Sequence, residues 1–458
     1  MRIEKDSLGE KEIPEGVYYG IHSQRSKENF DVAGERLDFQ VIRGIVKLKW
    51  ACALANQEMG LLSEEKASAI TFACDEILSD KYNDQFVVDV FQAGSGTSSN
   101  MNTNEVIANV AAVKLGGKPG DRDRVHPNDD VNKGQSTNNI FPSGIKVAAA
   151  EWAHSLQEAM RVLERDLHQK EEEFGHVIKS GRTHLQDAVP ITLGQEFGAY
   201  AHALEKANLR IEDARRHLLS LGVGGNAVGT GVNTSIEFRR LIIENLNNFT
   251  REKYHVAENG IEITQFLTDI AEMSGALKLL SLDLLKICND LRLLSSGPNT
   301  GIGEITLPAV EPGSSIMPGK INPSICEAAN MACIQVVGHD AAVSMACGMG
   351  QLELNTHMPL IGHTIMKSLR ILKRCCLMLA NKCVRGIEAN REVCRNNFEH
   401  SAGLPTVLNP QLGYDQVAVL VKESLDTRKT LRELVLEKEI MDEAHLDILL
   451  SKSTEPNL

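Results

Sequence analysis

Apolar residues recur at three- and four-residue steps along the middle of the chain. Between residues 144 and 179, a stretch without proline, Val147, Leu156, Met160 and Leu163 follow this spacing. The period is typical of one face of an α-helix. Similar stretches run over residues 193–221, 263–294, 323–349 and 361–387. Five long helices separated by loops rich in Gly, Pro and Asn predict a helical bundle.

Two stretches within these helices, residues 270–294 and 328–347, carry apolar residues on more than one face. A helix that is apolar nearly all round is buried in its protein. This pattern predicts contact with other subunits, and a large core within a monomer is the alternative. We therefore expect an oligomer.

The two ends of the chain differ from its middle. Residues 1–140 mix short helices with polar loops and predict an N-terminal mixed helical domain. Residues 141–388 hold the central long-helix bundle, and residues 389–458 predict a small C-terminal domain of shorter helices broken by Gly and Pro. A chain of 458 residues is long enough for this many domains, and its aromatic residues make up only 4%. We expect a mainly α fold.

Charge and cysteine usage narrow the class of protein. The formal charge of -13, from 48 basic and 61 acidic residues, argues against nonspecific nucleic-acid binding. No apolar run reaches the roughly 18 residues of a membrane span, and Met1–Asp6 has no apolar signal core. Ten cysteines without a Cys-x-x-Cys pair, several of them in apolar helical stretches, are typical of buried thiols. We therefore expect a reducing cytoplasm and no membrane partner.

The most distinctive polar segment is Pro-Gly-Ser-Ser-Ile-Met-Pro-Gly-Lys-Ile-Asn-Pro at residues 312–323. Its glycines let backbone amides approach a ligand closely. The hydroxyls of Ser314 and Ser315, the ammonium of Lys320 and the amide of Asn322 could all face one small anion. A plain loop is the alternative for such a composition.

Three further polar segments stand out. The first comprises residues 94–105, with the sequence Gly-Ser-Gly-Thr-Ser-Ser-Asn-Met-Asn-Thr-Asn-Glu. It lacks the Gly-Lys-Ser/Thr ending of a phosphate-binding P-loop and the glycine spacing of a nucleophile elbow. A loop that caps a helix is the alternative interpretation. Residues 126–139 include a histidine and two aspartates, but no second histidine lies at metal-ligand spacing, and turn formation explains their start. Residues 181–190 place His184 in a turn that joins two long helices.

Taken together, the four segments resemble the fumarase/aspartase superfamily. The motifs are GSGTxxNMNxNEV, HPNDxVNxxQSxN, GRTHLQDAxP and GSSIMPGKINP, and matches extend from residues 6–9 to residues 408–410. Members of this superfamily eliminate water, ammonia or an amine from succinate-type substrates. The resemblance implies a three-domain subunit, a homotetramer with a twenty-helix core, active sites each shared by three subunits, and no metal or organic cofactor.

The resemblance also implies a role for particular residues. The reaction removes a weakly acidic proton beside a carboxylate, and the resulting enediolate-like dianion needs many hydrogen-bond donors. Ser314 would be the general base, which requires backbone amides and a cation nearby on a loop that closes over the substrate. His184 and Asn138 would face the leaving group, and Glu327 would pair with His184 and set its protonation. The substrate carboxylates would be held by Thr97, Ser136, Thr137 and Ser315 on one side and by Thr183, Lys320 and Asn322 on the other. A second dicarboxylate site is implied near His126, Asn128 and Asp129.

The leaving group is indicated by shorter elements of sequence. Ser136-Thr137-Asn138 resembles the aspartate ammonia-lyase branch, whereas residues 126–130 and 326–328 resemble fumarases. We expect elimination of ammonia from L-aspartate to give fumarate. Hydration of fumarate, elimination from another succinate derivative and an inactive structural relative are the alternatives. Four positions depart from both branches and favour the succinate-derivative alternative: Asn139, Asn226, Asn299 and His357.

Overall fold

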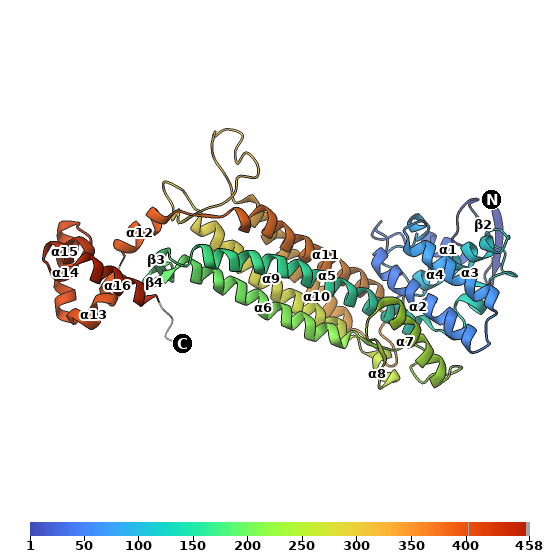
Figure 1. Cartoon of the computed structure of the whole chain (residues 1–458). Coiled ribbons are helices and arrows are strands. Elements are labelled where there is room, and N and C mark those ends of the chain that lie inside the picture. Colours follow the sequence, from blue (N-terminus) through green and yellow to red (C-terminus); the bar gives the residue numbers. More distant parts are fainter. Residues whose placement is uncertain (402, 455–458) are drawn as a thin grey trace. The chain divides into compact units, whose positions relative to one another are not determined.

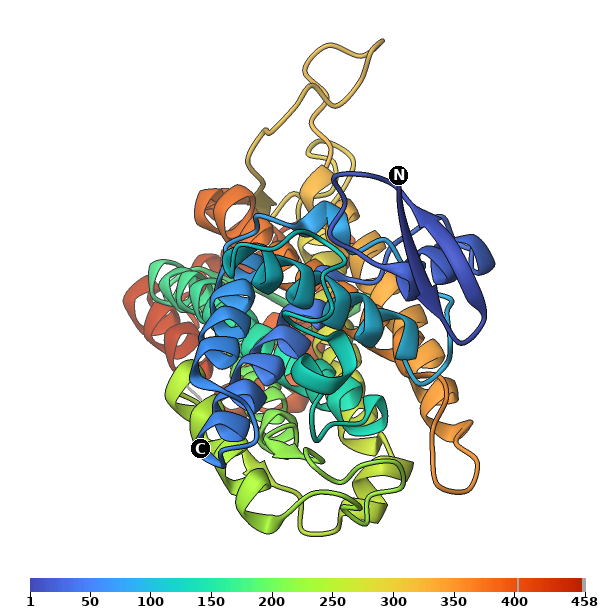
Figure 2. The ribbon, with the colours of Figure 1, turned by 90° about the vertical axis from the view of Figure 1, so that its right-hand side faces the viewer.

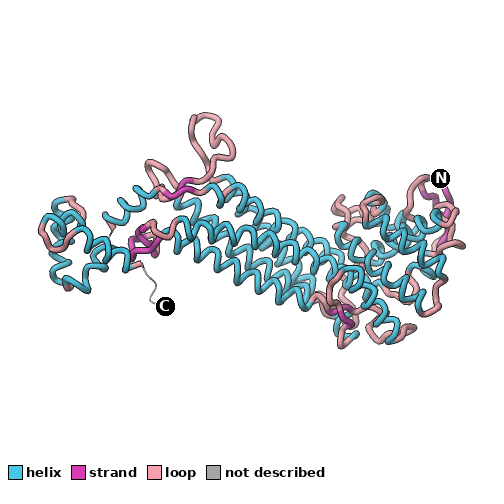
Figure 3. The backbone as a smooth tube through the Cα atoms, viewed as in Figure 1, coloured by secondary structure: helices cyan, strands magenta, loops and turns pink. Residues whose placement is uncertain are grey.

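The computed structural model describes residues 1–401 and 403–454. This part of the chain is mainly helical, and its paired strands form four small two-stranded sheets (Figure 3). The expected fold class is therefore confirmed. The chain divides into two compact units, and the expected division into three domains stays a prediction. Unit 1 comprises Met1–Gln157, Leu209–Ser281 and Ile334–Lys373, and unit 2 comprises Glu158–Asn208, Leu282–Cys333 and Arg374–Leu458.

Five long helices supply residues to both units. They are α5 (Thr137–Glu173), α6 (Leu193–His217), α9 (Thr268–Leu294), α10 (Ser324–Gly348) and α11 (Met358–Lys382). Within each unit their segments lie side by side (Figures 1 and 2). One expected helix is divided, because the backbone of Phe266 is extended and separates α8 (Gly260–Gln265) from α9. Another ends early, at Glu173, and its last expected residues belong to a strand.

Glycine allows the close packing that positions the start of α5. A Cβ atom on Gly44 of α2 (Phe39–Glu58) would lie 2.1 Å from the carbonyl oxygen of Gly144 in α5. The two backbones therefore touch at this crossing, and any larger residue at position 44 would separate them. This contact fixes the first turns of α5, where Thr137 and Asn138 lie.

Unit 1 contains the N-terminal part of the chain. Its remaining elements are β1 (Arg2–Asp6), β2 (Gly9–Ile13), α1 (Ile21–Asn29), α3 (Glu64–Leu78), η1 (Asn83–Gln85), α4 (Thr97–Lys114), η2 (Pro127–Val131), β5 (Ser220–Leu221), α7 (Ile236–Thr250) and β6 (His255–Val256). Strands β1 and β2 form an antiparallel hairpin, whereas β5 and β6 pair in parallel.

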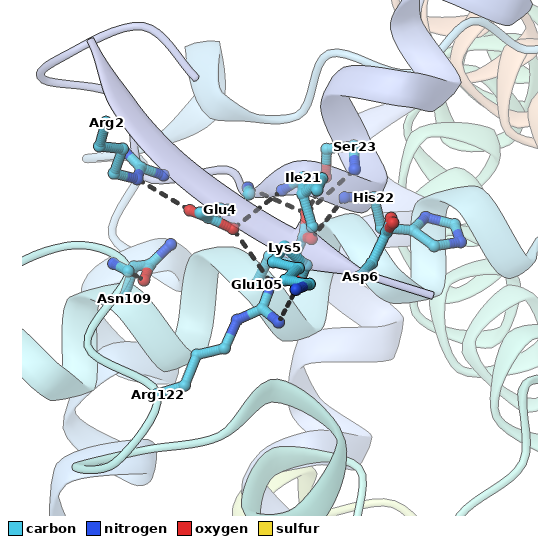
Figure 4. Close-up of polar contacts among 12 residues, drawn as sticks. Arg2, Glu4, Lys5, Asp6, Ile21, His22, Ser23, Glu105, Asn109 and Arg122 are labelled. Atoms are coloured by element: carbon cyan, nitrogen blue, oxygen red, sulfur yellow. Dashed lines mark hydrogen bonds and ion pairs between the residues drawn. The ribbon is translucent and has the colours of Figure 1, made fainter. Parts of the chain in front are cut away.

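A buried carboxylate holds the start of α1 (Figure 4). Glu105 of α4 accepts hydrogen bonds from the amides of Gly20, His22 and Ser23, at 2.9, 2.8 and 3.1 Å, and from the Ser23 hydroxyl at 2.5 Å. Burial raises the pKa of Glu105, and these donors oppose that shift. The last residue of the polar segment 94–105 thus has a structural role.

Unit 2 contains the β3–β4 hairpin and the C-terminal helices. Its remaining elements are β3 (Ile178–Thr183), β4 (Gln186–Thr192), β7 (Ile305–Thr306), η3 (Val384–Gly386), β8 (Glu388–Ala389), α12 (Arg391–Glu399), α13 (Gly403–Leu412), α14 (Tyr414–Thr427), α15 (Leu431–Glu437) and α16 (Glu443–Ser453). The helices from α12 onward share an apolar cluster that includes Phe398, Leu408, Leu434 and Leu446. The change to short helices after about residue 388 agrees with the sequence pattern.

Two further features bear on the class of protein. Among the described residues, no helix combines the length and the apolar character needed to cross a membrane. All ten cysteines are free thiols, and nine of them are buried.

Candidate active site

The residues predicted for the site fall into two groups. Unit 1 holds Thr97, His126, Asn128, Asp129, Ser136, Thr137 and Asn138, and unit 2 holds Thr183, His184, Ser314, Ser315, Lys320, Asn322 and Glu327.

In unit 1 the predicted carboxylate-binding residues lie at helix starts. Thr97 is the first residue of α4, and its hydroxyl lies 2.7 Å from that of Ser95. Gly96 precedes it with φ 81°, and a Cβ atom there would meet the ring of Phe141 at 2.3 Å. Glycine is therefore required at this position by both its backbone conformation and its surroundings. Backbone amides at a helix start favour an anion.

Thr137, the first residue of α5, is linked to a buried lysine. Asn100 Nδ2 donates to Thr137 Oγ1 at 2.9 Å and lies 3.4 Å from Asn132 Oδ1. Lys49 Nζ donates to the same Asn132 oxygen at 2.7 Å. The side chains of Lys49 and Asn100 are buried, and through these hydrogen bonds they orient the hydroxyl of Thr137.

Sequence reasoning assigned no role to Lys49. Burial lowers the pKa of this lysine to about 7. The signal in the sequence was a lysine between Leu48 and Trp50, immediately before the apolar residues 51–55 of α2. With this pKa, Lys49 is only partly protonated at neutral pH.

Asn138 and Asn139 point to different surroundings. Asn138 Nδ2 donates to the carbonyl oxygen of Ala227 at 2.8 Å, and its amide donates to Ser136 Oγ at 3.3 Å. Asn139 is buried and donates to Thr264 Oγ1 of α8 at 2.8 Å. The unusual asparagine at position 139 therefore packs inside unit 1.

His126 acts as the cap of the short helix η2. Its Nδ1 accepts hydrogen bonds from the amides of Asn128 and Asp129, at 3.2 and 3.1 Å. Asp130 accepts from the amide of His126 at 2.8 Å and from Lys66 Nζ at 2.7 Å. These contacts give the segment a structural role, and the second dicarboxylate site stays a prediction.

In unit 2, Thr183 and His184 lie at the tip of the β3–β4 hairpin. Thr183 pairs with Gln186, so His184 and Leu185 form a two-residue turn. Their φ angles are 57° and 60°. Such turns usually contain Asn-Gly, because side chains with a Cβ atom are strained at positive φ. His184 is exposed on this strained turn, as functional residues often are.

The base of the hairpin is held by a buried carboxylate. Glu304 has 0% exposure and accepts from Arg182 Nη2 at 2.7 Å and Nη1 at 3.0 Å, and Lys179 Nζ lies 3.0 Å away. Burial raises the pKa of Glu304, but the Arg182 hydrogen bonds and the Lys179 charge outweigh it, and the pKa is lowered overall. This ion-pair group orients the strand that presents Thr183.

Residues 312–323, the most distinctive polar segment of the sequence, form a loop whose two ends are hydrogen-bonded to each other. The amide of Gly313 donates to the carbonyl oxygen of Lys320 at 2.9 Å, and Asn322 Nδ2 donates to the carbonyl oxygen of Gly313 at 2.6 Å. A Cβ atom on Gly313 would lie 2.3 Å from the Lys320 oxygen, so this closure needs glycine. The loop lies between β7 and α10 and stands away from the long helices (Figures 1 and 2).

Within this loop the hydroxyl of Ser314 faces backbone donors. Ser314 Oγ accepts from the amides of Ile316 and Met317, at 3.2 and 3.0 Å. The side chains of Ser315 and Lys320 are exposed. Two amides aimed at one oxygen favour its negative charge.

Glu327 lies in the first turn of α10. Its carboxylate is 3.9 Å from Arg292 Nη2. No hydrogen bond joins Glu327 to His184 in residues 1–401 and 403–454, so that pairing stays a prediction.

Comparison with known proteins identifies the class of protein. Residues 9–338 match the model of the lyase family, and residues 404–454 match that of the fumarase C C-terminus. The chain belongs to the fumarase/aspartase superfamily of lyases and is an enzyme of that class.

Particular relatives match over nearly the whole chain. Aspartate ammonia-lyase of Helicobacter pylori is 45% identical over 449 residues, which cover 98% of this chain and 96% of that one. The enzymes of the same name from Escherichia coli and Bacillus subtilis are 43% and 42% identical, with 98% and 100% of this chain and 95% and 97% of theirs covered.

Solved structures show the same fold. A structure described as fumarate lyase:delta crystallin from Brucella melitensis, bound to cobalt, superposes with a TM-score of 0.96 at 44% identity over 99% of this chain and 100% of that one. Class II fumarase from Schistosoma mansoni superposes with a TM-score of 0.93 at 36% identity, and both chains are covered completely.

Proposed function

We propose that this lyase is an aspartate ammonia-lyase, which converts L-aspartate reversibly to fumarate and ammonia. The observation that carries the proposal is the full-length similarity, at 42–45% identity, to several aspartate ammonia-lyases. The sequence Ser136-Thr137-Asn138 at the start of α5 points the same way.

The base in this proposal is Ser314. As an alkoxide it takes a proton from C3 of aspartate, next to the carboxylate, and the electron pair moves into that carboxylate as an enediolate. The amides of Ile316 and Met317 support this role, because they stabilise negative charge on the Ser314 oxygen. Lys320 adds a fixed positive charge on the same loop.

The remaining steps assign the other groups. Hydroxyl donors Thr97, Ser136, Thr137 and Ser315 hold the carboxylate that becomes the enediolate, and Thr183, Lys320 and Asn322 hold the other one. When the enediolate collapses, the bond between C2 and the ammonium nitrogen breaks, its electron pair leaves with the nitrogen as neutral ammonia, and the proton taken up by Ser314 is later released to solvent. His184 and Asn138 face the leaving group, and Glu327 sets the protonation of His184.

We further propose a cytoplasmic homotetramer in which three subunits build each active site. The apolar side chains that α10 leaves exposed support such contacts: Met331 is 67%, Ile334 61% and Met345 74% exposed. Light scattering of the purified protein tests this directly, because it should give four times the 50.2 kDa mass of the chain. A measured mass equal to that of one chain would contradict both the active site shared by three subunits and the twenty-helix core.

A second candidate, fumarate hydratase, is favoured by the match to class II fumarase and by the fumarase-like residues 126–130. The two activities share the base and differ in the leaving group. Formation of fumarate from L-aspartate and from L-malate, measured separately, distinguishes them. Turnover of malate alone would replace the ammonia-lyase proposal by the second one.

A further inference from the structure

A cluster of possible metal ligands joins α5 and α6 within unit 2. Glu164 and His168 are four residues apart on α5 and so share one face of that helix. Glu205 comes from α6, and one ligand atom from each of the three side chains lies within 4.8 Å of the others. None of these residues has a role in the proposed reaction.

The orientation of His168 suits a metal ligand. Its Nδ1 lies 2.7 Å from Glu171 Oε2, and its Nε2 lies 3.0 Å from Glu205 Oε1. When a carboxylate binds one ring nitrogen of a histidine, it fixes the tautomer and directs the other nitrogen toward a metal. Here Glu171 takes that role, and Nε2 is left facing the acidic pair.

The carboxylate of Glu171 lies close to the backbone of α6. A Cβ atom on Gly198 of α6 would lie 2.3 Å from Glu171 Oε1. The end of the Glu171 side chain therefore lies against α6 at Gly198. On the other side, His202 Nδ1 lies 2.8 Å from Glu205 Oε2 and orients the α6 carboxylate.

We propose that Glu164, His168 and Glu205 bind one divalent first-row transition-metal ion, such as Zn²⁺, as a clip between α5 and α6. One imidazole with two carboxylates suits Zn²⁺, whereas Mg²⁺ prefers oxygen ligands and retains its water. On binding, the ion takes the place of the proton between His168 Nε2 and Glu205, and that proton goes to solvent. The helices α5 and α6 flank the β3–β4 hairpin, so the clip stabilises the base of the segment that carries Thr183.

A surface ion-pair network is the competing explanation, and the chain offers a matched control for it. His217 Nδ1 lies 2.6 Å from Glu272 Oε2, but this exposed pair belongs to no three-ligand cluster among the described residues. His217→Gln therefore removes a histidine–carboxylate pair without touching the clip.

The test uses untagged, full-length protein stripped with EDTA and titrated with ZnCl₂ by calorimetry. Wild-type protein and His217→Gln should bind one ion per subunit, and their Tm should rise with Zn²⁺. His168→Gln should lose this binding, and Glu171→Gln should weaken it about tenfold or more. If His168→Gln does not fold, Glu164→Gln takes its place. The proposal is overturned if wild type takes up no Zn²⁺, if MgCl₂ binds as tightly, or if the α5 variants bind Zn²⁺ like wild type.

Discussion

The backbone amide of Met317 donates a hydrogen bond to the hydroxyl of Ser314 at 3.0 Å. The neighbouring amide of Ile316 donates to the same oxygen, so a single short loop supplies both the proposed base and donors that stabilise negative charge on it. Closure of this loop on itself through Gly313 and Lys320 keeps these donors in place. A serine in such surroundings is suited to abstract a weakly acidic proton.

Replacing Ser314 by alanine should lower kcat by at least about 100-fold, because a general base contributes that much or more. Fumarate absorbance measures the rate, and light scattering should show an unchanged oligomer. For comparison, Ser315→Ala removes a donor to the carboxylate that becomes the enediolate but leaves the base in place, so it should lower kcat less than Ser314→Ala does. Substantial activity in the Ser314 variant would exclude this residue as the base.

Thr137→Ser should change the preference between substrates. The substitution keeps the hydroxyl that accepts from Asn100 but removes a methyl group at the start of α5. One methyl group in a binding pocket changes discrimination by about tenfold or more, so the ratio of kcat/KM for aspartate to that for malate should fall. Thr264→Ser, another threonine that accepts from an asparagine, is the matched control. An unchanged ratio in the Thr137 variant would show that this position does not select the leaving group.

Lys49 should make stability depend on pH. Its pKa is about 7 in the fold against 10.5 for an ordinary lysine, so between these values the unfolded chain binds the extra proton. The free-energy cost of burying Lys49 is full below pH 7 and is relieved as the pH rises toward 10.5. Relative to Lys49→Met, the wild type should therefore gain stability by up to about 1.4 kcal/mol per pH unit over this range. Chemical unfolding of both proteins at pH 7, 8 and 9 measures the difference, and a constant difference would contradict the account.

Glu304→Gln should destabilise unit 2 strongly. The variant leaves Lys179 and Arg182 as charges around a neutral, buried amide, which costs about 3–5 kcal/mol. Thermal unfolding should show a large fall in Tm, and hydrogen exchange should show faster opening of the β3–β4 hairpin. Glu196→Gln removes a more exposed partner of Lys179 and should have a smaller effect. Equal effects of the two variants would argue against a special role for Glu304.

Leu185→Gly should stabilise the hairpin turn. Leu185 has φ 60°, a conformation that costs a residue with a Cβ atom about 1–2 kcal/mol and costs glycine little. Because glycine also raises the entropy of the unfolded chain, we expect a net gain near 1 kcal/mol. Denaturant unfolding measures it, and a loss of stability would mean that Leu185 makes packing contacts that outweigh the strain.

The sequence predicted the long helices well because their apolar period is sustained over many turns, as in residues 144–173. It missed the β3–β4 hairpin, since a segment such as Ser-Gly-Arg-Thr-His-Leu has no strand alternation and its turn lacks Asn-Gly. It also missed Lys49, whose importance depends on Asn132 and Asn100 from other segments. Local periodicity determines helices, whereas a buried polar group depends on partners that are distant in the sequence.

The most direct measurement of the central claim is ultraviolet absorbance of purified protein mixed separately with L-aspartate and with L-malate. We expect fumarate to form from aspartate, and Ser314→Ala to abolish the signal. Fumarate from malate alone would make this enzyme a hydratase, and no fumarate from either substrate would contradict the proposed reaction.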